Sequence, residues 1–136
     1  MKSLFDECLD SLLNRVNILN DDESDILVEE FESSFEITTY GRVDWQNVIQ
    51  KHFLSDISDV LNLDKVANDD EIFIIWDDAS YPVVRAKLMD VLNSIEDVIA
   101  VSFDTWLYCA DKKYVVEFYH EGQTTFGVSD IEDLLK

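Results

Sequence analysis

VIAVSFDTWLYC (residues 98–109), YVVEFY (114–119) and TTFGV (124–128) are three consecutive runs rich in β-branched and aromatic residues. The short polar breaks ADKK (110–113) and HEGQ (120–123) separate them. This arrangement is typical of consecutive antiparallel strands joined by turns. We therefore predict that the fold is organised around an antiparallel sheet formed by these three runs.

Alternation along the first run divides its side chains between two faces of the predicted strand. The face that we expect in the core carries Ile99, Val101, Phe103, Thr105, Leu107 and Cys109. The opposite face carries Ser102, Asp104, Trp106 and Tyr108. Aromatic side chains with a polar tip suit either a face packed under a helix or a face offered to a partner. Both interpretations of Trp106 and Tyr108 stay open at this point.

Upstream of this stretch, EIFIIW (71–76) is a continuous apolar run of strand length, so we expect it in the middle of the sheet. A helix is predicted after Pro82, and four more by apolar residues at helical spacing over 3–19, 21–35, 44–53 and 55–61. The fold class is then α+β: a mostly antiparallel sheet of about four to five strands, with N-terminal helices and one crossover helix packed on it.

Length and composition indicate a folded chain. The 136 residues are enough to bury a core without metal or disulfide support, and 47% hydrophobic with 12% aromatic residues exclude a disordered chain. We expect one domain over 1–136, with a mainly helical part over 1–63, a sheet-forming part over 71–128 and a short terminal helix over 129–136.

The charge balance excludes several kinds of partner. The chain has 30 acidic and 10 basic residues, which gives a formal net charge of −20. Direct contact with nucleic acid or with an anionic membrane needs a basic face, which so acidic a chain can hardly assemble. The charge instead favours a basic protein as the partner.

The densest acidic run is in the second predicted helix. Between Asp21 and Glu36 there are eight acidic residues and no Lys or Arg. Such a run is either a solvated helix face or a field that attracts a basic partner, and both interpretations remain open.

Cysteine and histidine are too sparse for a disulfide scaffold or a zinc site. Cys8 and Cys109 read as buried thiols of a reducing compartment, and His52 and His120 are isolated. We expect no cofactor and no metal site, although a Cys109–His120 nucleophile pair stays open because hairpin residues can meet in space. Carboxylates interrupt the N-terminal MKSLFDECLDSLL where a signal peptide needs an apolar run, so we expect a cytoplasmic protein.

Asp77 and Asp78 follow directly after the apolar run 71–76. Carboxylates at the end of a strand can hold Mg²⁺ in phosphoryl-transfer enzymes, so a Mg²⁺-dependent enzyme that uses this pair is one alternative. The simpler interpretation is a turn that leads into a helix. No Gly-rich phosphate loop accompanies the pair, which favours the turn.

Three segments together resemble small immunity proteins of bacterial polymorphic-toxin systems, especially those of contact-dependent growth inhibition. The segments are GRVDW (41–45), EIFIIWDDASYPV (71–83) and FDTWLYCADKKYVVEFYHEGQTTFGV (103–128), and the resemblance covers roughly residues 35–128. It implies a cytoplasmic, non-enzymatic protein that binds the C-terminal toxin domain of its cognate effector. Many such toxins are nucleases.

A nuclease offers a basic cleft to the phosphate backbone, and a carboxylate-rich inhibitor can compete for that cleft. We therefore predict three groups of toxin contacts: Asp77, Asp78 and Tyr81 in the loop, Asp104, Trp106 and Tyr108 on the strand, and Glu29, Glu30 and Glu32 as the steering face. The other alternative is an acidic nucleic-acid mimic that inhibits a DNA- or RNA-binding protein.

Overall fold

The computed structural model describes residues 2–13 and 15–129. Its helices are α1 (Leu4–Ser11), α2 (Asp21–Ser34), α3 (Leu88–Asn93) and α4 (Ile95–Ile99), with 3-10 turns η1 (Trp45–Asn47) and η2 (Ile57–Asn62). Its strands are β1 (Asn17–Ile18), β2 (Gln50–Leu54), β3 (Glu71–Trp76), β4 (Val84–Lys87), β5 (Thr105–Cys109), β6 (Tyr114–Phe118) and β7 (Thr124–Val128).

All seven strands join one sheet in the order β1-β4-β3-β5-β6-β7-β2, and every neighbouring pair is antiparallel. The β5–β6–β7 meander confirms the prediction from residues 98–128. Strand β3 lies between β4 and β5, which confirms its expected place inside the sheet. The α+β class is confirmed, with more strands than the four to five expected.

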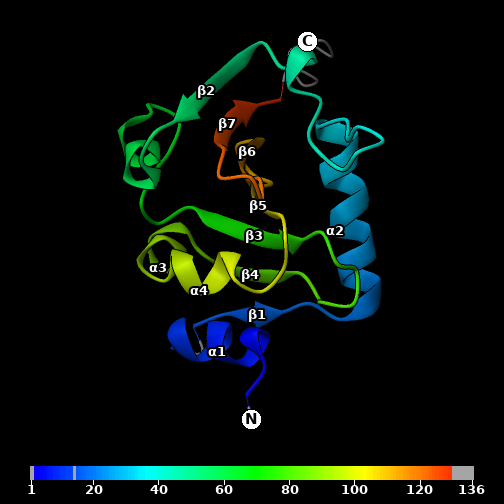
Figure 1. Cartoon of the computed structure of the whole chain (residues 1–136), viewed down its shortest axis with the longest axis vertical. Helices are drawn as coiled ribbons and strands as arrows, with labels where there is room; N and C mark the ends of the chain where they lie inside the picture. Colours follow the sequence, from blue (N-terminus) through cyan, green and yellow to red (C-terminus); the bar gives the residue numbers. More distant parts are fainter. Residues whose placement is uncertain (1, 14, 130–136) are drawn as a thin grey trace.

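Helices cover the two faces of the sheet unequally. Figure 1 shows α2 alone along one side, while α3 and α4 lie on the other. One core cluster joins Ile74, Leu107 and Val116 to Cys8 of α1 and Val98 of α4. A second cluster packs the opposite face of the sheet against the inner side of α2, through Leu27, Phe31, Phe35, Ile75, Trp106, Tyr108 and Val115.

Helix α2 begins and packs as its sequence predicts. The Asn20 side chain accepts the Glu23 N–H at 2.9 Å, and the Glu23 carboxylate accepts the Asn20 N–H at 3.0 Å. This reciprocal pair satisfies two N–H groups that a helix start leaves open. The expected apolar stripe is confirmed, since Leu27, Phe31 and Phe35 are all buried.

The predicted strand over 98–109 is wrong in its first half. Residues 95–99 form α4, and strand β5 begins only at Thr105. Val101 is buried as expected, but Ile99 and Phe103 are exposed, and the buried Val98 was not among the expected core residues. The alternation of apolar residues over 98–104 therefore comes from a short helix followed by a loop. A short apolar pattern of this kind cannot distinguish such a segment from a strand.

The helix predicted directly after Pro82 is also wrong. Residues 84–87 form strand β4, which pairs with β3 in a hairpin. Val84 and Ala86 are both buried, and a spacing of two residues places them on one face of a strand, whereas a helix would separate them. Helices α3 and α4 follow and carry the chain across β3 to β5, which confirms the expected helical crossover.

Two N-terminal helices need correction as well. The first ends at Ser11 because Leu13 adopts a left-handed φ of 55°, and the chain then forms β1. The helix predicted over 44–53 is instead η1 followed by β2, which pairs with β7. Strands from residues 1–63 thus occupy both ends of the sheet.

The predicted terminal helix over 129–136 lies outside the described residues beyond Ser129. Among the helices of the described ranges, none combines the length and the apolar character that a bilayer span requires.

Candidate functional site

A groove with a volume of about 690 Å³ opens beside α2, and we call it the acidic groove. Three segments supply most of its lining: α2, the loop 77–81 after β3, and the loop 37–41. Both loops lie next to α2 in Figure 1. The carboxylates that line the groove are Asp25, Glu29, Glu32, Asp77 and Asp104.

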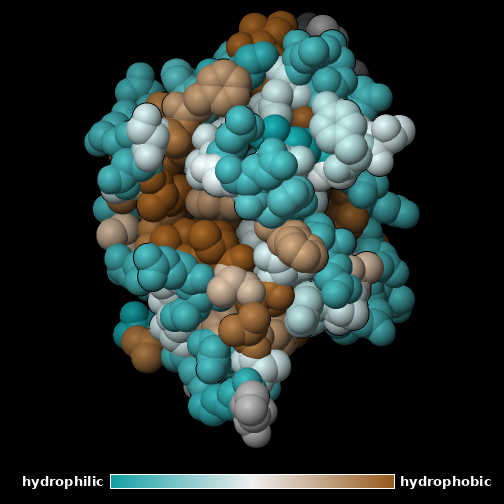
Figure 2. All heavy atoms as spheres, in the orientation of Figure 1, coloured by the Kyte–Doolittle hydropathy of each residue, from teal (hydrophilic) through white to brown (hydrophobic). Residues whose placement is uncertain are grey.

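The floor of the groove is apolar. It is lined by Phe31 of α2, Ile75 of β3 and Trp106 of β5, all of which belong to the second core cluster. Figure 2 shows that hydrophilic residues predominate along the edge of the molecule where α2 runs. A site with a carboxylate rim and an aromatic floor can bind a cationic group whose carbon chain is apolar.

The acidic groove brings together six of the nine residues predicted to contact a partner. They are Glu29, Glu32, Asp77, Tyr81, Asp104 and Trp106. Up to 77 positions separate them in the sequence (29 to 106), so the fold alone makes them neighbours.

The other three predicted residues lie elsewhere. Asp78 lines a neighbouring hollow together with Asp77, Tyr81 and Phe103. Tyr108 is fully buried beneath α2, and Trp106 is only 6% exposed. Of the two interpretations left open for the strand face that bears these two aromatics, the structure shows packing under a helix, because α2 covers this face.

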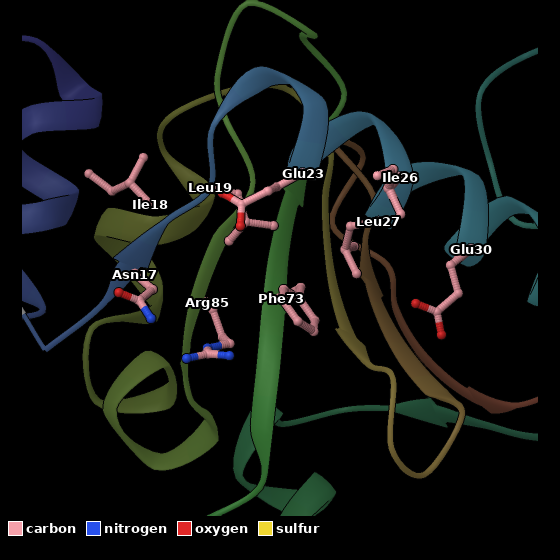
Figure 3. Close-up of a pocket in the computed structure, with 9 residues that line it drawn as sticks. All are labelled: Asn17, Ile18, Leu19, Glu23, Ile26, Leu27, Glu30, Phe73 and Arg85. Atoms are coloured by element: carbon pink, nitrogen blue, oxygen red, sulfur yellow. The ribbon is translucent and has the colours of Figure 1, made fainter.

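Glu30 faces a separate hollow at the other edge of α2, which Figure 3 shows in close-up with Phe73 and Arg85. Its carboxylate binds the Lys113 Nζ at 2.6 Å. Partial burial opposes the charge on Lys113, but the bonds to Glu30 and Tyr108 outweigh it and raise the Lys113 pKa. Glu30 is therefore partly neutralised, whereas no cation pairs with Glu29 or Glu32 among the residues that the structure describes.

Hydrogen bonds hold the acidic loops in place. The Asp77 Oδ1 accepts the Asp104 N–H at 2.9 Å, and the Asp104 Oδ1 accepts the His120 N–H at 2.8 Å. The His120 ring Nδ1 lies 3.0 Å from the same oxygen. Asp78 turns away and accepts the Ser80 N–H, and its bonds to Ser80 lower the Asp78 pKa. The two adjacent aspartates thus diverge.

A buried carboxylate that sequence reasoning missed lies beside the groove. Glu117 of β6 is 1% exposed, accepts four hydrogen bonds and forms an ion pair with Arg42, whose Nη2 lies 2.7 Å from the Glu117 Oε1. The donors are Arg42 Nε (2.8 Å), the Val43 N–H (2.8 Å), Trp45 Nε1 (3.0 Å) and Trp106 Nε1 (3.1 Å). The sequence signal for this site is the single glutamate inside the apolar run YVVEFY. A charge at a buried strand position must have partners, so such a glutamate indicates a buried ion pair.

The remaining chemical candidates do not assemble. In residues 2–13 and 15–129 no group of three or more His, Cys, Asp or Glu is placed to hold a metal ion. Cys109 pairs with Tyr114 at one end of the β5–β6 hairpin, whereas His120 follows the other end, so the Cys109–His120 pair is wrong. Burial also raises the pKa of the Cys109 thiol, which disfavours a nucleophilic thiolate.

Comparison of the chain with known protein families identifies its family. No curated protein matches the chain at a significant level. The family model described as "CdiI immunity protein EcoliA0-like" matches residues 2–127, which is nearly the whole chain. The match covers α2, both loops of the acidic groove and the strands beneath them, and the chain therefore belongs to this CdiI family of immunity proteins, which neutralise a toxin of contact-dependent growth inhibition.

Proposed function

We propose that this protein neutralises its cognate toxin by placing the acidic groove over the basic active-site cleft of the toxin domain, and that the toxin is a nuclease. The observation that carries the proposal is the convergence of five carboxylates from α2, the 77–81 loop and Asp104 around an aromatic floor. The protein acts in the cytoplasm by binding alone and catalyses no reaction.

The carboxylates provide both attraction and register. A net charge of −20 speeds the encounter with a basic domain, because electrostatic steering raises association rates. Once bound, carboxylates paired with Arg or Lys fix the orientation of the complex. The toxin cleft is then closed to a phosphate backbone, which needs the same cations.

The predicted contacts have different roles in this complex. Glu29, Glu32 and Asp77 meet toxin cations directly, with Asp78 and Tyr81 extending the contact along the loop. Asp104 and Trp106 form the inner wall and floor. Tyr108 supports α2 from beneath, and Glu30 contributes to the field through its partly neutralised charge.

Calorimetry with the purified cognate toxin domain tests the proposal. We expect Glu29→Gln with Glu32→Gln to weaken binding about 10- to 100-fold, since close charge pairs at interfaces contribute about 1.5 kcal/mol or more. The matched control is Glu96→Gln with Asp97→Asn, which removes the same charge from the exposed side of α4. If both double variants lose the same affinity for the toxin, the groove carboxylates act only through the overall negative charge of the protein. The proposed binding site would then be wrong.

The chain's charge of −20 also favours the second candidate, an acidic nucleic-acid mimic. A mimic should bind several unrelated basic proteins with similar affinity and steep salt dependence. An immunity protein should prefer its own toxin domain and should rescue cells that express it. Binding to a panel of basic DNA-binding proteins, measured at two salt concentrations, distinguishes the two.

A further inference from the structure

The loop from Glu36 to Asp44 is a small hairpin with a closed set of backbone hydrogen bonds. Ile37 and Val43 form a β-bridge, and the Asp44 N–H donates to the Glu36 carbonyl at 2.8 Å. At the tip Gly41 has a φ of +85°, a conformation that glycine adopts without strain. We call residues 36–44 the rim loop.

The rim loop is anchored from its Arg42 end. The Arg42 guanidinium binds the buried Glu117, lies 4.0 Å over the Tyr119 ring and donates to the Gln123 side chain at 3.0 Å. The Val43 N–H donates to the same carboxylate. Because Glu117 lies on β6, and Tyr119 and Gln123 lie in the turn between β6 and β7, this hairpin fixes where the rim loop lies.

Tyr40 is the residue that the rim loop presents. It is 73% exposed, lines the acidic groove and makes no ring contact or side-chain hydrogen bond with any described residue. Phe53 on β2 is equally exposed, at 72%, but does not line the groove. An exposed aromatic on a rigid support is typical of the anchors that dominate protein interfaces.

We propose that Tyr40 receives a Lys or Arg side chain of the toxin domain on its ring face, and that Glu117 is a positioning residue that holds the rim loop for this contact. The inference rests on the proposed function and adds to it a contact residue and its partner chemistry. Glu29 and Glu32 line the same groove as Tyr40, so a cation bound there interacts with two carboxylates and with an aromatic face. Because the rim loop is already anchored, little conformational entropy is lost when it binds the toxin.

Three substitutions at position 40 test the contact by calorimetry with the purified toxin domain. Tyr40→Ala should weaken binding about tenfold, the size of a desolvated cation–π contact of about 1.4 kcal/mol. Tyr40→Phe should retain most of the affinity, whereas Tyr40→Leu should lose as much as Tyr40→Ala because it keeps apolar area without a ring. The control Phe53→Ala should bind as the wild type does.

The outcomes separate this inference from the proposed function. Loss with Glu29→Gln and Glu32→Gln but none with Tyr40→Ala overturns the role of Tyr40 and leaves the groove in place. No loss in either overturns both. A Tyr40→Leu variant that binds like the wild type overturns the cation on the ring.

A double-mutant cycle tests the positioning role of Glu117. We expect Glu117→Gln to weaken toxin binding, and to add little further loss when combined with Tyr40→Ala, because both act through one contact. Full additivity overturns the positioning role. Arg42→Lys keeps the charge and loses the guanidinium hydrogen bonds to Glu117 and Gln123, so it repeats the cycle if Glu117→Gln folds poorly.

Discussion

The two faces of the sheet are built in different ways. On the face covered by α1, α3 and α4, the buried core is formed by apolar side chains such as Ile74 and Leu107. On the face covered by α2, the buried carboxylate of Glu117 and the indole N–H of Trp106 lie among the apolar residues. The first face thus provides mainly stability. The second face combines apolar packing with the carboxylates that line the acidic groove.

The lengths of the elements show how much of the second face α2 leaves uncovered. Helix α2 has 14 residues, which corresponds to about 21 Å. Seven strands at a spacing of about 4.8 Å extend over about 29 Å. One helix cannot cover that width, and the rim loop covers part of the remainder. The acidic groove lies along the side of α2 from Ser24 to Glu32.

The largest effect should come from the apolar face. Leu107→Ala should lower the free energy of unfolding by about 4 kcal/mol, because it leaves a cavity in a fully buried part of the core. Urea denaturation followed by circular dichroism measures this loss. The exposed Leu4→Ala should change it by less than about 0.5 kcal/mol. A comparable loss in both variants would contradict the assignment of stability to this face.

On the α2 face, Arg42→Ala should cost about 3 kcal/mol, because it removes the cation that pairs with a fully buried carboxylate. The control is Arg85→Ala, since Arg85 forms no ion pair with the residues that the structure describes. The same denaturation experiment applies. If the two arginine variants are equally stable, the buried charge contributes nothing to holding this face together.

A third effect should depend on pH. Burial opposes the charge on Asp70, but the Ala67 N–H, Lys112 and Tyr114 outweigh it and lower the Asp70 pKa below 3.8. A carboxylate with a lowered folded-state pKa stabilises the fold above its ordinary pKa, and this contribution is lost as the pH falls through the folded value. Asp70→Asn should therefore cost about 1.5 kcal/mol at pH 7.

The same variant should flatten the dependence of unfolding free energy on pH below the ordinary value of 3.8. Thermal melts from pH 2 to pH 7 measure this slope. The exposed neighbour Asp69 supplies the control, since Asp69→Asn should leave the slope as in the wild type. An unchanged slope in Asp70→Asn would remove this carboxylate from the acid transition.

The smallest effect on stability should come from the groove itself. Glu29→Gln with Glu32→Gln should alter the unfolding free energy by no more than about 0.5 kcal/mol, because both side chains are exposed and have no cationic partner among the described residues. A thermal shift assay beside the calorimetry tests this separation. A large loss of stability would mean that binding and folding share these residues.

Sequence patterns predicted the parts of this fold that are locally consistent. The meander from β5 to β7, the inner strand β3 and the capped helix α2 each have composition, period and termini that agree. Strand β2 was missed because His52 and Phe53 continue a helical spacing from Trp45 and Val48, and strand β4 was missed because VRAK is too short to show alternation by itself. Tertiary pairing with β7 and β3 decides their structure.

The sequence indicated many of the residues that line the candidate site, but not how the site is assembled. Six of the nine expected contact residues line the acidic groove. They are acidic or aromatic residues on α2 or near the ends of strands, and such positions can be recognised in the sequence. The sequence could not show that α2 buries Tyr108, nor that Arg42 reaches Glu117 across 75 positions. Both facts depend on contacts between distant segments.

One close approach limits how such a protein can change. Trp45 lies over Gly127 so tightly that an added Cβ there would come within 2.5 Å of the indole ring. The same indole donates to Glu117, so a side chain at position 127 would disturb the anchor of the rim loop from behind. Position 127 is therefore expected to remain glycine as long as Trp45 keeps this place, whereas the exposed residues of α2 and the loops carry no such packing constraint.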